Sequence, residues 1–214
     1  MKICFFIKYE ITWGSSRERV GVYLESLKKR GHVYRIISVI PDRLSGIGLG
    51  NRSDTSVLFR WFYSFWYSKI LKYLKFIFLI KISPGFDVIF IQKVNIPVIL
   101  LKLLKARNKN IIFDFDDLCF LPESAKDIAF WQRLKLKWRH WYQDPKVLAM
   151  FSHVIAGNKY LAKIANDAQQ TNVTIIPTPV DCRAYSPCQR GKNSPLVIGF
   201  TGAGENHLRH LKLL

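Results

Sequence analysis

Acidic residues are scarce in this sequence, and several short motifs that mark common enzyme classes are missing. The 214-residue chain has 15 Asp and Glu against 33 Lys and Arg, which gives a formal net charge of +18 at pH 7. It contains no G-x-S-x-G, Walker A or dinucleotide-binding G-x-G-x-x-G motif, so none of these three chemistries is indicated. The positive charge favours anionic partners: phosphate esters, anionic lipid headgroups or nucleic acid.

Paired cysteines and long apolar runs are also missing. The four cysteines form no C-x-x-C pair, which favours a reduced, cytoplasmic compartment. The apolar run at the amino terminus is too short for a signal peptide. A membrane span needs about 20 mostly apolar residues, whereas the most apolar region, residues 57–82, is interrupted by Arg60 and by several lysines. We therefore expect no span. His32, His140 and His153 are isolated and fit no metal spacing, so they are expected to be surface or packing residues, and no cofactor is expected.

Short apolar segments alternate with segments of helical periodicity along the first 180 residues. Such alternation is typical of a parallel sheet whose right-handed crossovers carry helices on both faces, which predicts a Rossmann-like α/β fold. Gly31 is expected to end the first helix, which contains Val20, Tyr23, Leu24 and Leu27. The expected strands are 2–7, 33–39, 86–91, 110–115, 152–156 and 173–176, and the other expected helices are 96–107, 130–142 and 159–168.

The carboxyl-terminal part of the sequence predicts the beginning of a second domain. Residues 1–182 are expected to form the Rossmann-like domain, and residues 183–195 a linker. Residues 196–214 then read as a strand, a glycine-rich turn and a partial helix, which are too few to enclose a core. The second domain is therefore expected to be incomplete in this chain.

Polar residues collect where the predicted strands end. Ligands of open parallel sheets bind beyond the carboxyl ends of the strands, so these residues are candidate substrate ligands. The loop GSSRER leads into a helix, whose amino terminus suits an oxyanion, and its arginines could add forked contacts to a phosphate. Alternatively, one serine is only an N-cap and the arginines are surface residues. The candidates are Gly14, Ser15, Ser16, Arg17 and Arg19 after the first strand, Gln92 after the third and Asn158 after the fifth.

The segment IIFDFDD places three carboxylates in and after the fourth strand. Asp114 lies within the strand and is expected to be a buried, hydrogen-bonded structural acid. Asp116 and Asp117 follow it and are better placed to accept hydrogen bonds from sugar hydroxyls. A D-x-D motif can also hold a divalent metal, an alternative that remains open at this point. Neighbouring acids raise each other's pKa unless a cation compensates, and an arginine of the first loop would supply it.

Residues 57–82 combine aromatic residues, among them Trp61, Phe62, Phe65, Trp66 and Tyr67, with lysines at positions 69, 72 and 75. A basic, aromatic, amphipathic helix of this kind suits the plane of a membrane interface. The alternative is a helix packed on the sheet with its lysines outward, which is favoured for the carboxyl half. Residues 131–142 have the same character and leave the same choice open.

Several segments together resemble one enzyme family. With FDVIFIQKV, IIFDFDD, VIAGNKYLA and VTIIPTPVD in this order, the chain resembles the amino-terminal domain of family 4 glycosyltransferases, which have the two-domain GT-B fold. VIAGNKYLA followed by IPTPVD is the most specific part. VIGFTGAGENHLRHL looks like the start of that family's nucleotide-sugar domain. The resemblance covers nearly the whole chain but about half of such an enzyme.

The resemblance implies that the two domains bind different substrates. The first domain would bind a lipid-linked or glycan acceptor, and the second would bind the nucleotide-sugar donor. Transfer would retain anomeric configuration and need no metal. Asp116 and Asp117 would be the catalytic pair that orients the acceptor. The donor-binding residues would be Thr201, Gly202, Ala203 and Gly204, and the chain would work at the inner face of the membrane.

Two other functions remain open from the sequence alone. The chain could be a non-catalytic interaction domain that pairs with a separately encoded donor half. It could also bind nucleic acid through its basic and aromatic residues, although it has no recognisable reading helix or RNP motif. The main prediction is a glycosyltransferase, and no nucleic-acid partner is expected.

Overall fold

The computed structural model describes residues 1–40, 68–117, 145–180 and residue 182. The chain divides into two compact units, Met1–Val180 and Asp181–Leu214, and the fold given below is that of the first unit. Several predicted elements lie outside the described residues: the helix over 130–142, the aromatic start of segment 57–82, the linker 183–195 and the strand and turn of 196–214. The predicted domain boundary remains a prediction.

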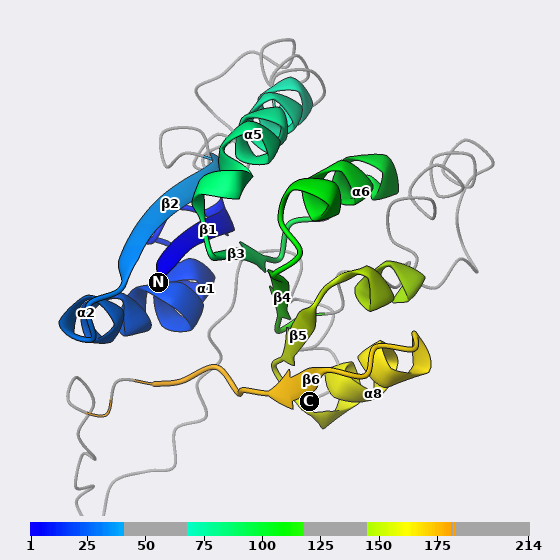
Figure 1. Cartoon of the computed structure of the whole chain (residues 1–214). Helices are drawn as coiled ribbons and strands as arrows, with labels where there is room; N and C mark the ends of the chain where they lie inside the picture. Colours follow the sequence, from blue (N-terminus) through cyan, green and yellow to red (C-terminus); the bar gives the residue numbers. More distant parts are fainter. Residues whose placement is uncertain (41–67, 118–144, 181, 183–214) are drawn as a thin grey trace, which may run out of the picture. The chain divides into compact units, whose positions relative to one another are not determined.

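The described strands form one six-stranded, all-parallel sheet in the order β2-β1-β3-β4-β5-β6 (Figure 1). Each strand coincides with a predicted one, with ends that differ by a few residues, because the apolar runs that predict them fill both faces of a buried sheet. This confirms the expected Rossmann-like α/β fold. The strands are β1 Lys2–Tyr9, β2 Val33–Ile40, β3 Val88–Gln92, β4 Ile111–Phe115, β5 His153–Ala156 and β6 Val173–Ile175.

The helices follow the strands as the periodicity predicts. The first helical segment contains a π-helical turn, and it ends at Gly31, whose φ of 76° is the left-handed conformation expected of a helix C-terminus. The helical elements are α1 Gly14–Ser16, η1 Arg17–Gly21, α2 Val22–Lys29, α5 Ser68–Ile82, η3 Ser83–Gly85, α6 Val98–Arg107, η5 Pro145–Met150 and α8 Lys159–Asp167.

The two faces of the sheet are covered unequally by the described helices. Helices α5, α6 and α8 pack on one face through residues such as Phe76, Leu104 and Leu161, whereas α2 covers the other face next to Phe5 (Figure 1). The cause is crossover handedness, because only the β1-to-β2 connection runs in the opposite direction along the sheet. The chain therefore reverses direction between β1 and β3. This topological switch point is where open α/β sheets bind ligands.

Helix α5 packs on the sheet, but its lysines are not arranged as predicted. Phe76 and Leu79 are buried against the sheet. Lys72 and Lys75 are only partly exposed, and the Lys75 ammonium donates to the carbonyl of Ser38 on the edge strand β2. The expectation of outward lysines is wrong for these two residues, because their long stems cover apolar surface while one ammonium group satisfies an edge carbonyl.

The outer side of α5 is apolar instead. Ile70, Leu74, Ile77 and Phe78 recur at helical spacing and are 40 to 58% exposed. In the part of the chain that the structure describes, no helix is long and apolar enough to cross a membrane.

Candidate functional site

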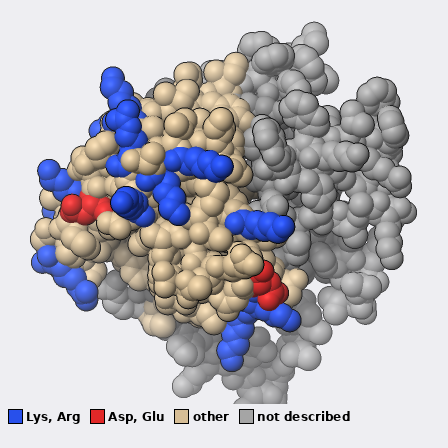
Figure 2. All heavy atoms as spheres, turned by 45° about the vertical axis from the view of Figure 1, so that its right-hand side comes forward, with Lys and Arg blue, Asp and Glu red and all other residues tan. Residues whose placement is uncertain are grey.

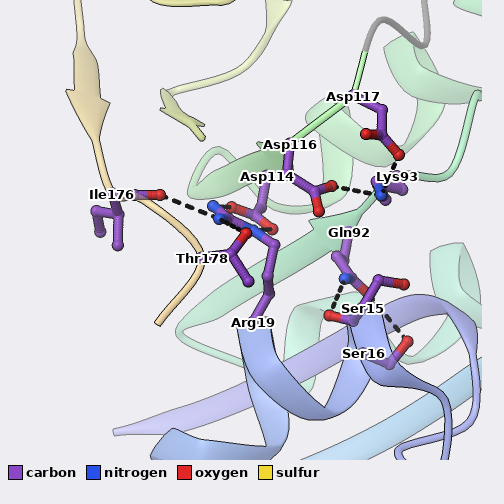
Figure 3. Close-up of polar contacts among 10 residues, drawn as sticks. All are labelled: Ser15, Ser16, Arg19, Gln92, Lys93, Asp114, Asp116, Asp117, Ile176 and Thr178. Carbon is purple, nitrogen blue, oxygen red and sulfur yellow. Dashed lines mark hydrogen bonds and ion pairs between the residues drawn. The ribbon is translucent and has the colours of Figure 1, made fainter. Parts of the chain in front are cut away.

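The loops that leave β1 and β3 are joined at the switch point by a buried polar contact. The Ser16 hydroxyl donates to the Tyr9 carbonyl at 3.0 Å. It also lies 3.2 Å from Oε1 of Gln92, and Nε2 of Gln92 donates to the Ser15 carbonyl at 2.9 Å (Figure 3). Ser16 and Gln92 are fully buried. These contacts fix the loop after β1 against the end of β3 and form the buried side of the site.

The helix that follows β1 begins without a side-chain cap. Trp13 occupies the N-cap position, and neither Ser15 nor Ser16 does. The alternative in which one of these serines is the N-cap is therefore wrong, because the Ser16 hydroxyl turns back to Tyr9 instead. Gly14 is exposed, and a Cβ built on it would meet no atom within 4 Å. The backbone of the first turn thus borders open space.

A buried ion pair joins the first helical segment to β4. The guanidinium of Arg19 donates two hydrogen bonds to the carboxylate of Asp114, and the bond from Nε measures 2.7 Å (Figure 3). Both side chains are 2% exposed. Asp114 is therefore the buried structural acid that the sequence predicts. The first-loop arginine that was expected to compensate Asp116 and Asp117 pairs with Asp114 instead. The fork of Arg19 is occupied inside the domain, so this residue does not present it to a phosphate.

Arg19 also holds the segment that follows β6. Its Nη1 donates to the Ile176 carbonyl at 3.0 Å and to the Thr178 hydroxyl at 3.3 Å (Figure 3). The pair borders an otherwise apolar cavity of about 290 Å³ between α2, the sheet and Pro179. One guanidinium thus connects the segments after β1 and β6 to the centre of the sheet.

Burial and pairing act against each other on these two groups. Burial raises the pKa of the Asp114 carboxyl above its ordinary value, and the hydrogen bonds and charge of Arg19 oppose this rise. Burial alone would lower the pKa of Arg19, but its bonds to Asp114 outweigh that effect, and the net pKa of Arg19 is raised. The guanidinium therefore stays charged, and each charge depends on the other for its place in the interior.

The two candidate catalytic aspartates share one lysine, which sequence reasoning missed. The Lys93 ammonium lies 2.5 Å from Oδ1 of Asp116 and 2.6 Å from Oδ2 of Asp117 (Figure 3). Burial lowers the pKa of Lys93, but hydrogen bonds to both carboxylates outweigh this effect, so the net pKa of Lys93 is raised. Asp116 is 17% exposed and Asp117 75% exposed. Asp117 is thus the carboxylate that faces solvent at this rim.

Lys93 adopts a backbone conformation that is unusual for a residue with a side chain. Its φ is 53°, and its amide donates to the Asp114 carbonyl at 2.9 Å. This turn directs the lysine from the end of β3 towards the end of β4. Residues in the left-handed region persist where the surroundings hold them, and they cluster at functional sites. A sequence signal exists, since a lysine lies two residues after the predicted third strand, but the pairing of β3 with β4 is needed to interpret it.

The loop after β5 packs tightly against Asp116. A Cβ on Gly157 would lie 2.9 Å from Cα and 3.0 Å from Cβ of Asp116, so only glycine fits without a shift. The next residue, Asn158, accepts a hydrogen bond from the Leu161 amide at 2.9 Å and is the N-cap of α8. Asn158, which the sequence predicts to bind substrate, thus has a structural role as a helix cap. The pattern of a turn followed by a helix in VIAGNKYLA could have indicated this role.

The structure brings most of the predicted residues of the first domain to one edge. Arg17 does not join the others, because its side chain is exposed and pairs with Glu18 at 2.9 Å. The donor-binding prediction, Thr201 to Gly204, lies outside the described residues. We name the group at the switch point the switch-point rim; it consists of Gly14, Ser15, Ser16, Gln92, Lys93, Asp116 and Asp117.

The described residues offer few other reactive groups. Among residues 1–40, 68–117 and 145–180, no three or more His, Cys, Asp or Glu side chains are grouped so that they could hold a metal ion. Beside Asp116 and Asp117 the compensating cation is the Lys93 ammonium. Cys4 is buried in β1, and burial raises the pKa of its thiol to about 12, so it remains protonated at neutral pH.

Comparison with known proteins adds no family. No protein-family model matches the sequence, and no curated protein matches it.

Proposed function

We propose that this chain is the acceptor-binding part of a GT-B glycosyltransferase, which moves a sugar from a nucleotide-sugar to a lipid-linked or glycan acceptor with retention. The observation that carries the proposal is the switch-point rim, where an exposed carboxylate and an uncapped helix start lie at the position that parallel sheets use for ligands. The nucleotide-sugar would be bound by a second domain, of which residues 196–214 would be the beginning.

The acids of the rim have the chemistry to orient an acceptor hydroxyl. The carboxylate oxygens of Asp116 and Asp117 contact the Lys93 ammonium, and carboxylate oxygens can accept further hydrogen bonds from hydroxyl groups. Asp117 is exposed enough to bind a sugar hydroxyl directly, whereas Asp116 is held by Lys93 and by the close loop at Gly157. Hydrogen bonds to charged groups are worth about 1.5 to 3 kcal/mol.

Replacement of Asp117 is expected to weaken acceptor use. In Asp117→Asn the charge is lost while the shape is kept, so KM for the acceptor should rise by about ten-fold to a hundred-fold. The measurement is transfer rate against acceptor concentration. The matched control is Asp167→Asn, an exposed aspartate at the end of α8 on the opposite edge of the sheet. Equal effects of the two substitutions would contradict the proposed role of Asp117.

The function itself is tested by transfer of labelled sugar from a panel of nucleotide-sugars to lipid-linked and soluble glycan acceptors. The protein should be assayed alone and with proteins that co-purify with it from its native source. Transfer only after a nucleotide-sugar-binding partner is added would favour the interaction domain that pairs with a separate donor half. No transfer in any combination would refute the proposed glycosyltransferase activity.

We also propose that α5 and α6 rest on an anionic membrane surface. The exposed apolar residues of α5 are joined by Ile99 and Leu103, which are 68% and 52% exposed on the neighbouring α6. The same two helices carry exposed lysines, Lys81 on α5 and Lys102 and Lys105 on α6. Figure 2 shows Lys and Arg spread over the described residues on one face of the molecule, with few acids among them. Apolar side chains framed by cations suit anionic lipid headgroups.

This surface predicts a mutation that weakens vesicle binding. In Ile77→Glu an apolar contact is replaced by a charge that anionic lipids repel, so the fraction bound to phosphatidylglycerol vesicles should fall by about ten-fold. Sedimentation with vesicles measures it. Val22→Glu is the control, because Val22 is 40% exposed on α2, which covers the other face of the sheet. If Ile77→Glu binds like the wild type, or if Val22→Glu loses binding equally, this surface is not the docking face.

A further inference from the structure

Lys93 is fixed at its backbone and at its ammonium group. It follows β3 with a left-handed φ of 53°, and its amide donates to the Asp114 carbonyl on β4 at 2.9 Å. Its side chain is 11% exposed, and the ammonium lies 2.5 Å from Oδ1 of Asp116. Asp116 is in turn backed by Gly157, where an added Cβ would lie 2.9 Å from the Asp116 Cα. The lysine is therefore anchored at both ends by groups that are themselves held in the fold.

Asp117 is the exposed end of this arrangement. Its carboxylate is 75% exposed, and the Lys93 ammonium donates to its Oδ2 at 2.6 Å (Figure 3). An exposed aspartate that nothing holds exchanges among staggered χ1 rotamers. The bond from the lysine uses one carboxylate oxygen, and the second can accept a hydrogen bond from a hydroxyl group at the same time. A contact of this kind can hold a carboxylate in place and leave it able to bind a ligand.

The anchoring of Lys93 decides how much this contact can achieve. A surface ion pair usually contributes little, because the cost of ordering two flexible side chains offsets their attraction. Here the lysine is already ordered by Asp116 and by its own turn, so only the short aspartate side chain has to be fixed. Burial lowers the pKa of Lys93, but its hydrogen bonds to both aspartates outweigh this effect and raise the net pKa. The cation is therefore present at neutral pH.

We propose that Lys93 is a positioning residue, which holds the Asp117 carboxylate in one orientation for the acceptor hydroxyl and uses Asp116 as its anchor. The inference rests on the proposed sugar transfer, and it assigns to the lysine a task that is carried out through Asp117. A side chain that is ordered before the ligand arrives does not have to be ordered on binding. This saving corresponds to about two-fold to ten-fold in affinity for one side chain.

NMR measures the orientation of Asp117 without any transfer assay. The three-bond couplings between Hα and the two Hβ atoms of Asp117 should show one χ1 rotamer in the wild type and an average over rotamers in Lys93→Asn. Asparagine removes the cation but tolerates the left-handed backbone, so the turn is kept. Lys163→Asn replaces an exposed lysine on α8 and should leave the couplings unchanged. Averaged couplings in the wild type, or a single rotamer in Lys93→Asn, would overturn the proposal.

Kinetics separate positioning from a purely structural role. In Lys93→Asn the KM for the acceptor should rise by about two-fold to ten-fold with little change in kcat, and Lys93→Arg, which keeps a cation, should restore most of the loss. In an Asp117→Asn background, Lys93→Asn should have no further effect on KM, because the lysine acts through that carboxylate. Lys163→Asn should transfer sugar like the wild type. An equal rise in KM in both backgrounds would give the lysine an independent role and contradict the proposal.

The two measurements also distinguish this inference from the proposed function. If the wild type transfers no sugar while Asp117 loses its single rotamer in Lys93→Asn, the proposed function fails, but Lys93 still fixes Asp117. If sugar is transferred and the Asp117 couplings are the same in the wild type and in Lys93→Asn, the function stands and the positioning role is wrong.

Discussion

Arg19→Met is expected to lower the free energy of unfolding by about 3 to 5 kcal/mol, which is the usual result of removing one partner from a buried ion pair. The substitution leaves the Asp114 carboxylate at 2% exposure without its bidentate partner, beside an apolar cavity. It also removes the donor that holds the Ile176 carbonyl and the Thr178 hydroxyl. Urea unfolding followed by circular dichroism measures the loss.

The controls for this experiment are a substitution of Arg17 on the same helical segment and a double variant that also replaces Asp114, the partner of Arg19. Arg17→Met removes an exposed arginine that pairs with Glu18 on the surface, and it should change stability by about 0.5 kcal/mol or less. The double variant Arg19→Met with Asp114→Leu removes both charges and should recover much of the loss, because the uncompensated carboxylate is the main cost. If Arg19→Met is as stable as Arg17→Met, the pair does not stabilise the fold.

Gly157→Ala is expected to reduce sugar transfer by about a hundred-fold and stability by about 1 to 3 kcal/mol. The new methyl group would meet the backbone of Asp116 at 2.9 Å, so the loop after β4 must move. Overpacking of a tight contact costs about this much stability. A displacement of about 1 Å at reacting groups can cost two orders of magnitude in rate. The transfer assay and urea unfolding provide the two readouts.

Gly85→Ala is the matched control for Gly157→Ala. A Cβ on Gly85 would meet no atom within 4 Å, and the residue lies in the short η3 helix before β3, away from the acids. It should therefore leave transfer and stability close to the wild type. If Gly157→Ala also leaves transfer unchanged, the position of Asp116 is not critical for activity, and the role proposed for it is wrong.

The order of strands in the sheet decides which residues become neighbours. Gln92 and Ser16 are 76 residues apart in the sequence, yet they touch because β3 pairs with β1 instead of with β2. Lys93 reaches Asp116 and Asp117 because β4 is the next strand on the other side of β3. Sequence reasoning placed the residues at the strand ends but did not give this order, so the shared lysine was missed.

The direction of individual side chains was also beyond the sequence. The spacing of Lys72 and Lys75 predicts that they lie near each other on one side of α5, and it is silent on which side faces the sheet. The deciding contact is the apolar core, in which Phe76 and Leu79 are almost fully buried. Burying these two residues turns the neighbouring lysines inwards and leaves Ile77 and Phe78 exposed.

The amino-acid sequence by itself determined the alternation of strands and helices, the end of the first helix at Gly31 and the collection of polar residues beyond the strands. These are local properties, since they follow from apolar periodicity and from the backbone freedom of glycine. Only the tertiary structure decided that Arg19 is bound by Asp114 and that Lys93 holds two aspartates. Those contacts join segments that the sheet brings together from distant parts of the chain, or they depend on which way a side chain turns. Local pattern specifies neither.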